Sequence, residues 1–283
     1  MTHYNLLIGS SVGGRPATSF VELTSGSGTF IVPSGYNSLH IQYAVGAGGG
    51  AAGGASYDKA GGESAGAGGG SGAYISDKIF SVTEGETLSF SIGSGGSAGN
   101  QTGNFGQPRI ASAGTNTTLS GSSAGSLFTL GAGGGSSGTG GGVQGPLRTN
   151  TAGTAGSATI GGTAVTSGIF SDTDHSIKNV TTNTSGPVGS FNQSGNGAAG
   201  DLSGSGNCGV DNCRISGFDG GDSYAGNIAG GSGGSSSGSG TAGSAGTRGS
   251  GGGGGAAQVT GGGATNGAAG GNGEIKYRFL QVI

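Results

Sequence analysis

The sequence predicts an all-β fold, in which a small antiparallel β-sandwich clamps a bundle of polyglycine II helices, with essentially no α-helix. Three observations predict it. Glycine accounts for 76 of the 283 residues, against a usual share of about 7%. Short apolar stretches with period-two alternation stand near both ends of the chain and between the glycine tracts. No segment carries the apolar stripe of an amphipathic helix.

The expected strands are stretches rich in β-branched and aromatic residues. They are residues 18–23, 29–33, 38–45, 73–82, 87–93, 126–131 and 274–283. Strict alternation within 38–45 places Leu39, Ile41 and Tyr43 on one face. His40, Gln42 and Ala44 then lie on the other. We expect the first strands and the last strand to pair with each other near the chain ends.

The glycine tracts span residues 46–72, 131–142 and 226–273. In the last tract glycine recurs at every third position, at Gly240, Gly243, Gly246, Gly249, Gly252 and Gly255. Three residues per turn is the period of the polyproline II helix, which makes no internal hydrogen bonds. Such helices need hydrogen bonds from their neighbours, and only glycine lets two backbones approach closely. The tracts therefore predict a laterally bonded bundle, which the five prolines hardly interrupt.

Composition and charge exclude several classes of protein. Proline is too scarce, and the glycine register too discontinuous, for a collagen helix. The ten basic residues are scattered and the net charge is −3, so nucleic acid is not an expected partner. The apolar stretch Leu6-Leu7-Ile8 is too short for a signal peptide or a membrane-spanning helix. We expect a protein made in the cytoplasm, without membrane insertion.

Catalytic and metal chemistry have little support in the sequence. His3, His40 and His175 are far apart, and Asp172 and Asp174 beside His175 are typical of a solvated loop. We expect no enzyme activity and no cofactor. Cys208 and Cys213 form a C-x4-C pair that could close a disulfide loop or remain as two free thiols. No metal site is expected, because two further ligands close to the cysteines are missing.

Large or charged side chains that interrupt glycine outside the expected strands are candidate contacts for a partner. Aromatic rings offer large contact areas at small entropic cost, although each ring could instead cover a small local core. The candidates are Tyr57, Phe105, Phe170, Asp172, Asp174, His175, Phe191, Phe218, Asp219, Asp222 and Tyr224.

The order of several short motifs resembles a known family. Phe30-x-Val32-Pro33-x-Gly35 leads into a strand that ends in the glycine run 46–50, and Tyr74, Gly85, Ile92, Gly93, Gly271 and Gly273 follow at matching places. This order is similar to that of the glycine-rich domain of phage tail-fibre and tail-tip proteins. The composition also resembles the polyglycine II tip adhesins of T-even-like phages, which present variable loops to outer-membrane proteins or sugars.

The resemblance implies a virion protein exposed on the particle surface. We expect residues 1–28 to dock onto other fibre or virion proteins and residues 29–283 to form the glycine-rich domain, with 143–228 as an irregular, loop-rich insertion. The expected function is that of a tail-fibre tip adhesin for a bacterial outer-surface protein or glycan. A structural or decorating virion protein and an ice-binding protein are the alternatives.

Overall fold

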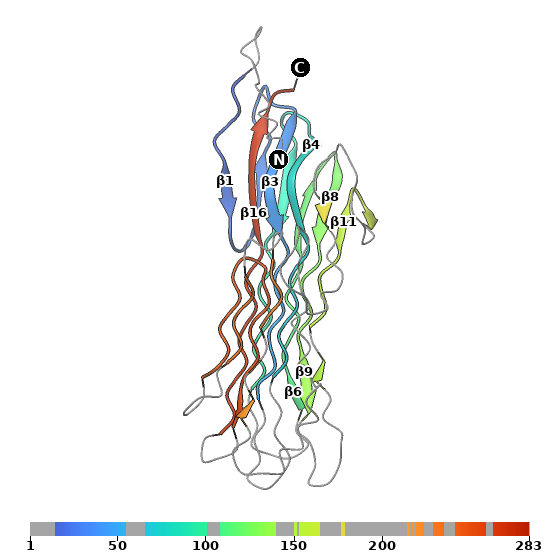
Figure 1. Ribbon diagram of the computed structural model, residues 1–283. Helices are drawn as coiled ribbons and strands as arrows, with labels where there is room; N and C mark the ends of the chain where they lie inside the picture. The colour runs from blue at the N-terminus through green and yellow to red at the C-terminus, as the bar shows by residue number, and fades with distance from the viewer. Residues whose placement is uncertain are drawn as a thin grey trace.

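The computed structural model describes residues 15–54, 66–100, 108–139, 150–151, 153–164, 177–178, 214–215, 217, 219–223, 229–234, 241–258 and 263–282. The longer β-strands gather at one end of a long molecule, and extended segments run from them side by side to the other end, where some of the short strands lie (Figure 1). The described residues contain no helix, so the expected all-β fold is confirmed.

The strands that surround the glycine tracts coincide closely with the expected ones. They are β1 (Val21–Leu23), β2 (Ser27–Ile31), β3 (Ser38–Val45), β4 (Tyr74–Ser81), β5 (Thr87–Ser91), β7 (Thr117–Gly121), β8 (Gly125–Leu130) and β16 (Glu274–Leu280). Only β7 among these was not expected. The shorter strands are β6 (Pro108–Ile110), β9 (Ser137–Thr139), β10 (Asn150–Thr151), β11 (Ala158–Ile160), β12 (Thr163–Ala164), β13 (Ile177–Lys178), β14 (Arg214–Ile215) and β15 (Ala257–Gln258).

Two antiparallel sheets form the sandwich, in the orders β1-β16-β3-β4-β13 and β12-β11-β8-β7-β5-β2. Their inner faces pack together. The rings of Phe30 on β2 and Tyr277 on β16 stack with their centroids 4.5 Å apart, and the ring centroids of Phe80 on β4 and Phe128 on β8 are 6.0 Å apart. Each fully buried side chain contributes about 1.5–3 kcal/mol. Because β16 pairs with both β1 and β3, the expected pairing of first and last strands is confirmed.

The alternation expected along β3 is wrong beyond Ile41. Tyr277 and Lys276 are consecutive on β16, yet they pair with Ile41 and Tyr43, which leaves Gln42 as an extra residue in β3. This β-bulge shifts the phase of the strand. Leu39, Ile41 and Ala44 all face the core, whereas Tyr43 lies on the outer face beside Lys276.

The glycine segments form the expected bundle, and residues 46–54 run through its centre. N–H groups of this segment bond in turn to different neighbours. Gly46, Gly49 and Ala52 donate to carbonyls of 67–73, while Gly48, Ala51 and Gly54 donate to carbonyls of 265–271, all at 2.7–3.1 Å. Its carbonyls accept from segments 96–99, 133–136 and 252–255. Every third residue therefore faces the same neighbour, as a three-residue helix requires.

The number of glycines in a segment follows its place in the bundle. Residues 251–255 are consecutive glycines and all are buried. In the outer segment 241–247 only the third-position Gly243 and Gly246 are partly buried, and the residues between them are exposed. A Cβ at either glycine would collide with a backbone carbonyl of the neighbouring segment. The third-residue register thus marks the one edge of an outer helix that touches the bundle.

Small polar side chains satisfy backbone groups around the outside of the bundle. The N–H of Ser94 donates to Oγ1 of Thr115 at 2.8 Å, and the N–H of Gly95 donates to Oδ1 of Asn272 at 3.0 Å. In the same way, the N–H of Ser232 donates to Oγ of Ser244 at 2.6 Å. These oxygens take the place of the backbone carbonyl that a further helix would supply.

A tight turn divides the glycine tract 226–273, although glycine recurs at every third position on both sides of the turn. Ser250 N–H donates to Thr247 O at 2.9 Å, and the two residues between them have positive φ, +43° at Arg248 and +78° at Gly249. This is the conformation of a type I′ turn. Residues 241–247 and 250–256 are therefore two antiparallel helices.

The described residues near the expected unit boundaries bond to the sandwich and the bundle, and the division into units stays a prediction. β2 spans residue 28 and pairs with β5, and β1 belongs to the sandwich. Within 143–228, residues 153–157 and 219–223 bond into the bundle, and 158–160 form β11. These described parts join the same lateral network as the rest of the bundle. The remainder of 143–228 lies outside the described residues.

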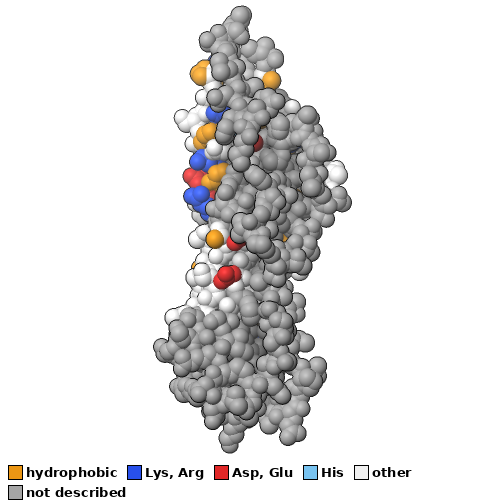
Figure 2. All heavy atoms as spheres, in the orientation of Figure 1, with side chains coloured by type: hydrophobic (Ala, Val, Ile, Leu, Met, Phe, Trp, Pro, Cys, Tyr) orange, Lys and Arg blue, Asp and Glu red, His pale blue; other side chains and the backbone are white. Residues whose placement is uncertain are grey.

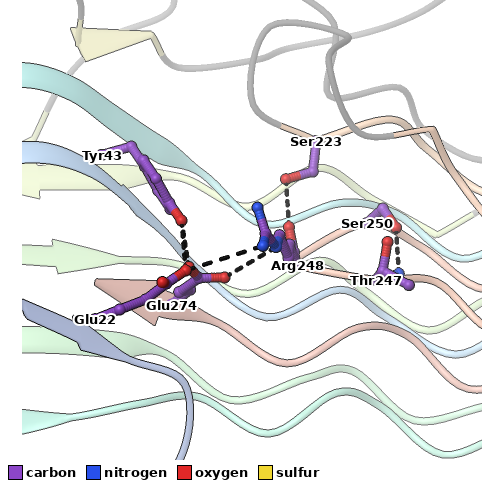
Figure 3. Close-up of polar contacts among 7 residues, drawn as sticks. All are labelled: Glu22, Tyr43, Ser223, Thr247, Arg248, Ser250 and Glu274. Carbon is purple, nitrogen blue, oxygen red and sulfur yellow. Dashed lines mark hydrogen bonds and ion pairs between the residues drawn. The ribbon is translucent and has the colours of Figure 1, made fainter. Parts of the chain in front are cut away.

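A polar cluster connects the sandwich to the bundle (Figure 3). This junction cluster consists of Glu22, Tyr43, Arg248 and Glu274, from β1, β3, the 247–250 turn and β16. Nε of Arg248 lies 3.3 Å from Oε2 of Glu274, and the Tyr43 hydroxyl contacts both carboxyl groups, 2.9 Å from Oε1 of Glu22. Ser223 Oγ donates to Arg248 O at 2.7 Å. The turn is thereby held against the sheet.

The two carboxyl groups of the junction cluster have opposite pKa shifts. Burial raises the pKa of Glu274, and its hydrogen bond with Glu22 raises it further. The same hydrogen bond, followed by that from Tyr43, lowers the pKa of Glu22. Burial and both carboxyl groups raise the pKa of Tyr43. Glu274 thus retains a proton more readily than Glu22 does.

Candidate functional site

The described parts of the glycine helices end on the side of the bundle farthest from the sandwich, here called the distal end (Figure 1). The described chain stops and resumes there in pairs: Gly54 and Gly66, Asn100 and Pro108, Thr139 and Asn150, Gly234 and Thr241, and Gln258 and Gly263. Bonds from Gly54 N–H to Thr265 O and from Gly66 N–H to Gly255 O, both 2.8 Å, hold adjacent helices at this level. The bundle therefore brings distant parts of the sequence to one end.

Most of the candidate contact residues cannot be placed in this arrangement. Tyr57, Phe105, Phe170, Asp172, Asp174, His175, Phe191, Phe218 and Tyr224 lie outside the described residues, as do Cys208 and Cys213. Tyr57 follows Gly54 by three positions and Phe105 precedes Pro108 by three, so both belong to sequence that joins the bundle at its distal end. Their role as contacts stays a prediction.

Asp219 and Asp222 are described, and both bond to the bundle. Oδ1 of Asp219 accepts the N–H of Gly233 at 2.6 Å, and Oδ1 of Asp222 accepts the N–H of Gly230 at 2.7 Å. The carboxylates are three residues apart and so are their donors, as expected where two three-residue helices lie side by side. They fasten segment 229–234 to segment 219–223. Neither bond tests the expected role in receptor binding.

Arg109 is a buried cation at the distal end that the sequence did not single out. It is 1% exposed, and its Nη1 donates to Gly53 O at 2.7 Å. Burial lowers its pKa to about 10. Its neighbours β9 and the central helix are built from small residues, which leave room for a long side chain. The signal available in the sequence was a single arginine at the end of a glycine-rich segment, which is weak.

Charged and hydrophobic side chains gather over the sandwich on the face shown in Figure 2. The described surface of the bundle on this face consists mostly of backbone and uncharged polar side chains. On the outer face of β16, the guanidinium of Arg278 lies 4.5 Å from the Phe20 ring centroid, a cation–π contact. Nε of Arg278 also donates to Nδ1 of His40 at 3.0 Å. His40 is thus an outward residue of a strand, as expected.

Neither a metal centre nor a membrane span is found in the described ranges. No group of three or more His, Cys, Asp or Glu side chains in those ranges could hold a metal ion. None of these segments forms a helix that is long and apolar enough to cross a bilayer.

One comparison with known proteins gives a match. A family model described as the glycine-rich domain matches residues 24–280. None of the curated proteins matches the chain. The matched range begins just after β1 and ends with β16, so it spans the bundle and every strand of the sandwich except β1.

Proposed function

The chain belongs to the glycine-rich domain family, and from this premise we propose that it is a virion tail-fibre tip protein, an adhesin that binds a bacterial surface receptor. The observation that carries the proposal is the one-ended arrangement of the bundle. The described helices from most of the chain end together at the distal end, opposite the sandwich. The sequences between them can vary without altering the lateral bonds.

The bundle is well suited to hold such a binding end. Each buried helix is bonded in several directions, and the close approach of backbones leaves no room for Cβ atoms at most of its glycines. A platform of this kind limits the entropy lost when a partner binds, because the loop ends are already fixed. The protein acts by binding, without catalysis.

The proposed partners lie at opposite ends. A bacterial outer-surface protein or glycan contacts the distal end, through Tyr57 and Phe105. Fibre or virion proteins contact the sandwich end, where residues 1–14 join Arg15. The proposed location is therefore the virion surface.

An ice-binding role receives less support. It would need a flat, regular face of threonine or alanine free to contact ice. Several outward hydroxyl and amide oxygens of the bundle, such as those of Thr115, Ser244 and Asn272, already accept backbone hydrogen bonds. A structural or decorating virion protein without a receptor is the other alternative; it would be present in many copies on the shell and would not bind cells.

The experiment is to label the purified protein fluorescently and measure its binding to a panel of bacterial species by flow cytometry. We expect saturable staining of a subset of species. The double variant Tyr57→Ser and Phe105→Ser should lower staining at least about tenfold, the loss expected when contact aromatics are removed. Val282→Ser, which alters a 52% exposed side chain at the sandwich end, is the matched control.

Two results would count against the proposal. Absence of staining on every species that the parent virus infects would favour the decorating role. Equal staining by the double variant and the control would remove Tyr57 and Phe105 from the receptor site.

A further inference from the structure

His40 lies where several segments meet on the outer face of the five-stranded sheet. It belongs to β3, and its imidazole lies beside Arg278 on β16 and Asp77 on β4. The ring of Phe20, from the segment before β1, lies 5.8 Å from the imidazole between centroids. The His40 side chain is 14% exposed and that of Asp77 is 66% exposed, so protons from solvent can reach the histidine.

The contacts of His40 determine which of its nitrogens carries the proton. Nε of Arg278 donates a hydrogen bond to Nδ1 of His40 at 3.0 Å, and an arginine Nε always carries its hydrogen. Nδ1 is therefore unprotonated. The imidazole is neutral with its proton on Nε2, the atom that lies 3.5 Å from Oδ1 of Asp77.

The same hydrogen bond orients Arg278 against the Phe20 ring. The guanidinium carbon lies 4.5 Å from the ring centroid, and Nζ of Lys276 lies 5.9 Å from the same centroid. Cations close to an aromatic face are attracted by its quadrupole. Arg278 thus connects His40 to Phe20, and through Phe20 to the segment that precedes β1.

This segment, residues 15–20, bonds to the end of β16. Thr18 N–H donates to Phe279 O at 3.1 Å, and Phe279 N–H donates to Oγ1 of Thr18 at 2.9 Å. Arg15 N–H donates to Oε1 of Gln281. The segment precedes the ladder between β1 and β16, so its order depends on such bonds and on the packing of the Phe20 ring.

We propose that His40, Arg278 and Phe20 form a pH-sensitive latch, which holds residues 15–20 against β16 while His40 is neutral and loosens when His40 takes up a second proton. Histidine is the side chain whose charge changes between about pH 5 and pH 8. The second proton binds Nδ1, which can then no longer accept the hydrogen bond from Arg278. Two cations would face each other, so Arg278 turns away and Phe20 loses its contact with the guanidinium.

The charges around His40 give the latch two states. Among the described residues, the charged groups that face it are Arg278 from β16 and Asp77 from β4, with Lys276 beyond the Phe20 ring. Arg278 opposes the second proton, whereas the carboxylate of Asp77 attracts it. Asp77 is held at a positive φ of +52°, a backbone conformation that is uncommon outside glycine and that recurs in switch regions.

Opening the latch would expose the Phe20 ring and loosen residues 15–20 at the sandwich end. A fall in pH would therefore change the end at which we propose that fibre or virion proteins bind, and would leave the distal end as it is. The latch itself does not depend on that proposed function, since it is built from residues of the sandwich.

NMR of the full chain at about pH 7.5 and about pH 5 tests the latch on both sides of the histidine titration. At the higher pH, the imidazole nitrogen signals of His40 should show a proton on Nε2 alone. At the lower pH, the amides of Thr18 and Phe279 should exchange at least about tenfold faster after correction for the intrinsic rate. Amides of the β3–β4 ladder should keep their protection. A proton on Nδ1 at the higher pH, or equal corrected exchange of both amides, would overturn the proposal.

A substitution of His40 separates the latch from other groups that titrate in this range. His40→Gln keeps a neutral acceptor for Arg278, so the pH dependence of the Thr18 amide should disappear. His3→Gln is the matched control and should retain it. The carboxyl groups of the junction cluster are intact in both variants. A pH dependence that survives His40→Gln would therefore assign the effect to carboxyl groups and overturn the latch.

Two further variants test the charges that face the imidazole. In Arg278→Gln, His40 should take up its second proton at a higher pH than in the wild type, because the opposing cation is gone. In Asp77→Asn it should do so at a lower pH, because the attracting carboxylate is gone. The titration is followed by the same imidazole signals. Unchanged titration of His40 in both variants would show that neither group controls its charge, and would refute the latch.

Discussion

Gly49→Ala should strongly destabilise the bundle. The new Cβ would lie far closer than 3.0 Å to the carbonyl oxygen of Gly134, so segment 131–136 must move away by more than about 1 Å to restore van der Waals contact. The bonds from Gly133 to Ala47, 2.8 Å, and from Ser136 to Gly50, 3.1 Å, would then be lost. Two buried bonds cost about 1–3 kcal/mol each when their groups stay unpaired, and overpacking adds about 1–3 kcal/mol.

The expected total of roughly 5 kcal/mol lowers the melting temperature by about 10 °C or more in a domain of this size, measured by differential scanning calorimetry. Two controls separate crowding from backbone effects. At Gly99 the nearest atom to a new Cβ is 3.1 Å away, and at Gly26, with φ +79°, no atom lies within 4 Å. Both alanine variants should cost only about 1 kcal/mol. If Gly49→Ala melts within about 2 °C of Gly99→Ala, close backbone packing does not hold the bundle together.

Three further variants test the polar contacts. Burial raises the pKa of Glu86, but hydrogen bonds from the N–H groups of Thr83, Ala124 and Ser123 lower it overall. The ionised carboxylate therefore stabilises the fold above about pH 4.3, and this contribution is lost as the pH falls through the folded pKa. The free energy of urea unfolding of Glu86→Gln should vary less with pH in that range. Glu274 has a raised pKa, so wild-type stability should decline as the pH rises from about 4.3 through the folded pKa, and Glu274→Gln should lack this decline in urea unfolding. Asp219→Ala should cost about 1 kcal/mol in thermal unfolding by removing the acceptor of Gly233 N–H, whereas Asp219→Asn should retain it; equal losses in both would show that charge, not the hydrogen bond, matters.

The sequence was informative where local pattern determines structure. Period-two alternation located most of the sandwich strands, and the period of three indicated laterally bonded helices. The bulge at Gln42 was missed because it arises from the pairing of β3 with β16, which no local pattern contains. The turn at Arg248 and Gly249 was missed for a related reason, since glycine continues the register through the turn.

The candidate site was less predictable than the fold. Residues that interrupt glycine were identified, but their partners depend on which helices become neighbours. Asp219 and Asp222 have the spacing of one helix edge, and the match to Gly230 and Gly233 exists only once segment 229–234 lies beside them. Arg109 has no pattern around it that predicts its burial.

The two ends of the described chain meet at the sandwich. Arg15 N–H donates to Oε1 of Gln281 at 2.6 Å, and the C-terminus lies at that end in Figure 1. A tether, tag or fusion partner attached near either residue would therefore leave the distal end facing outward. The protein can be displayed in one orientation on a bead, sensor or particle, whichever end is used for attachment.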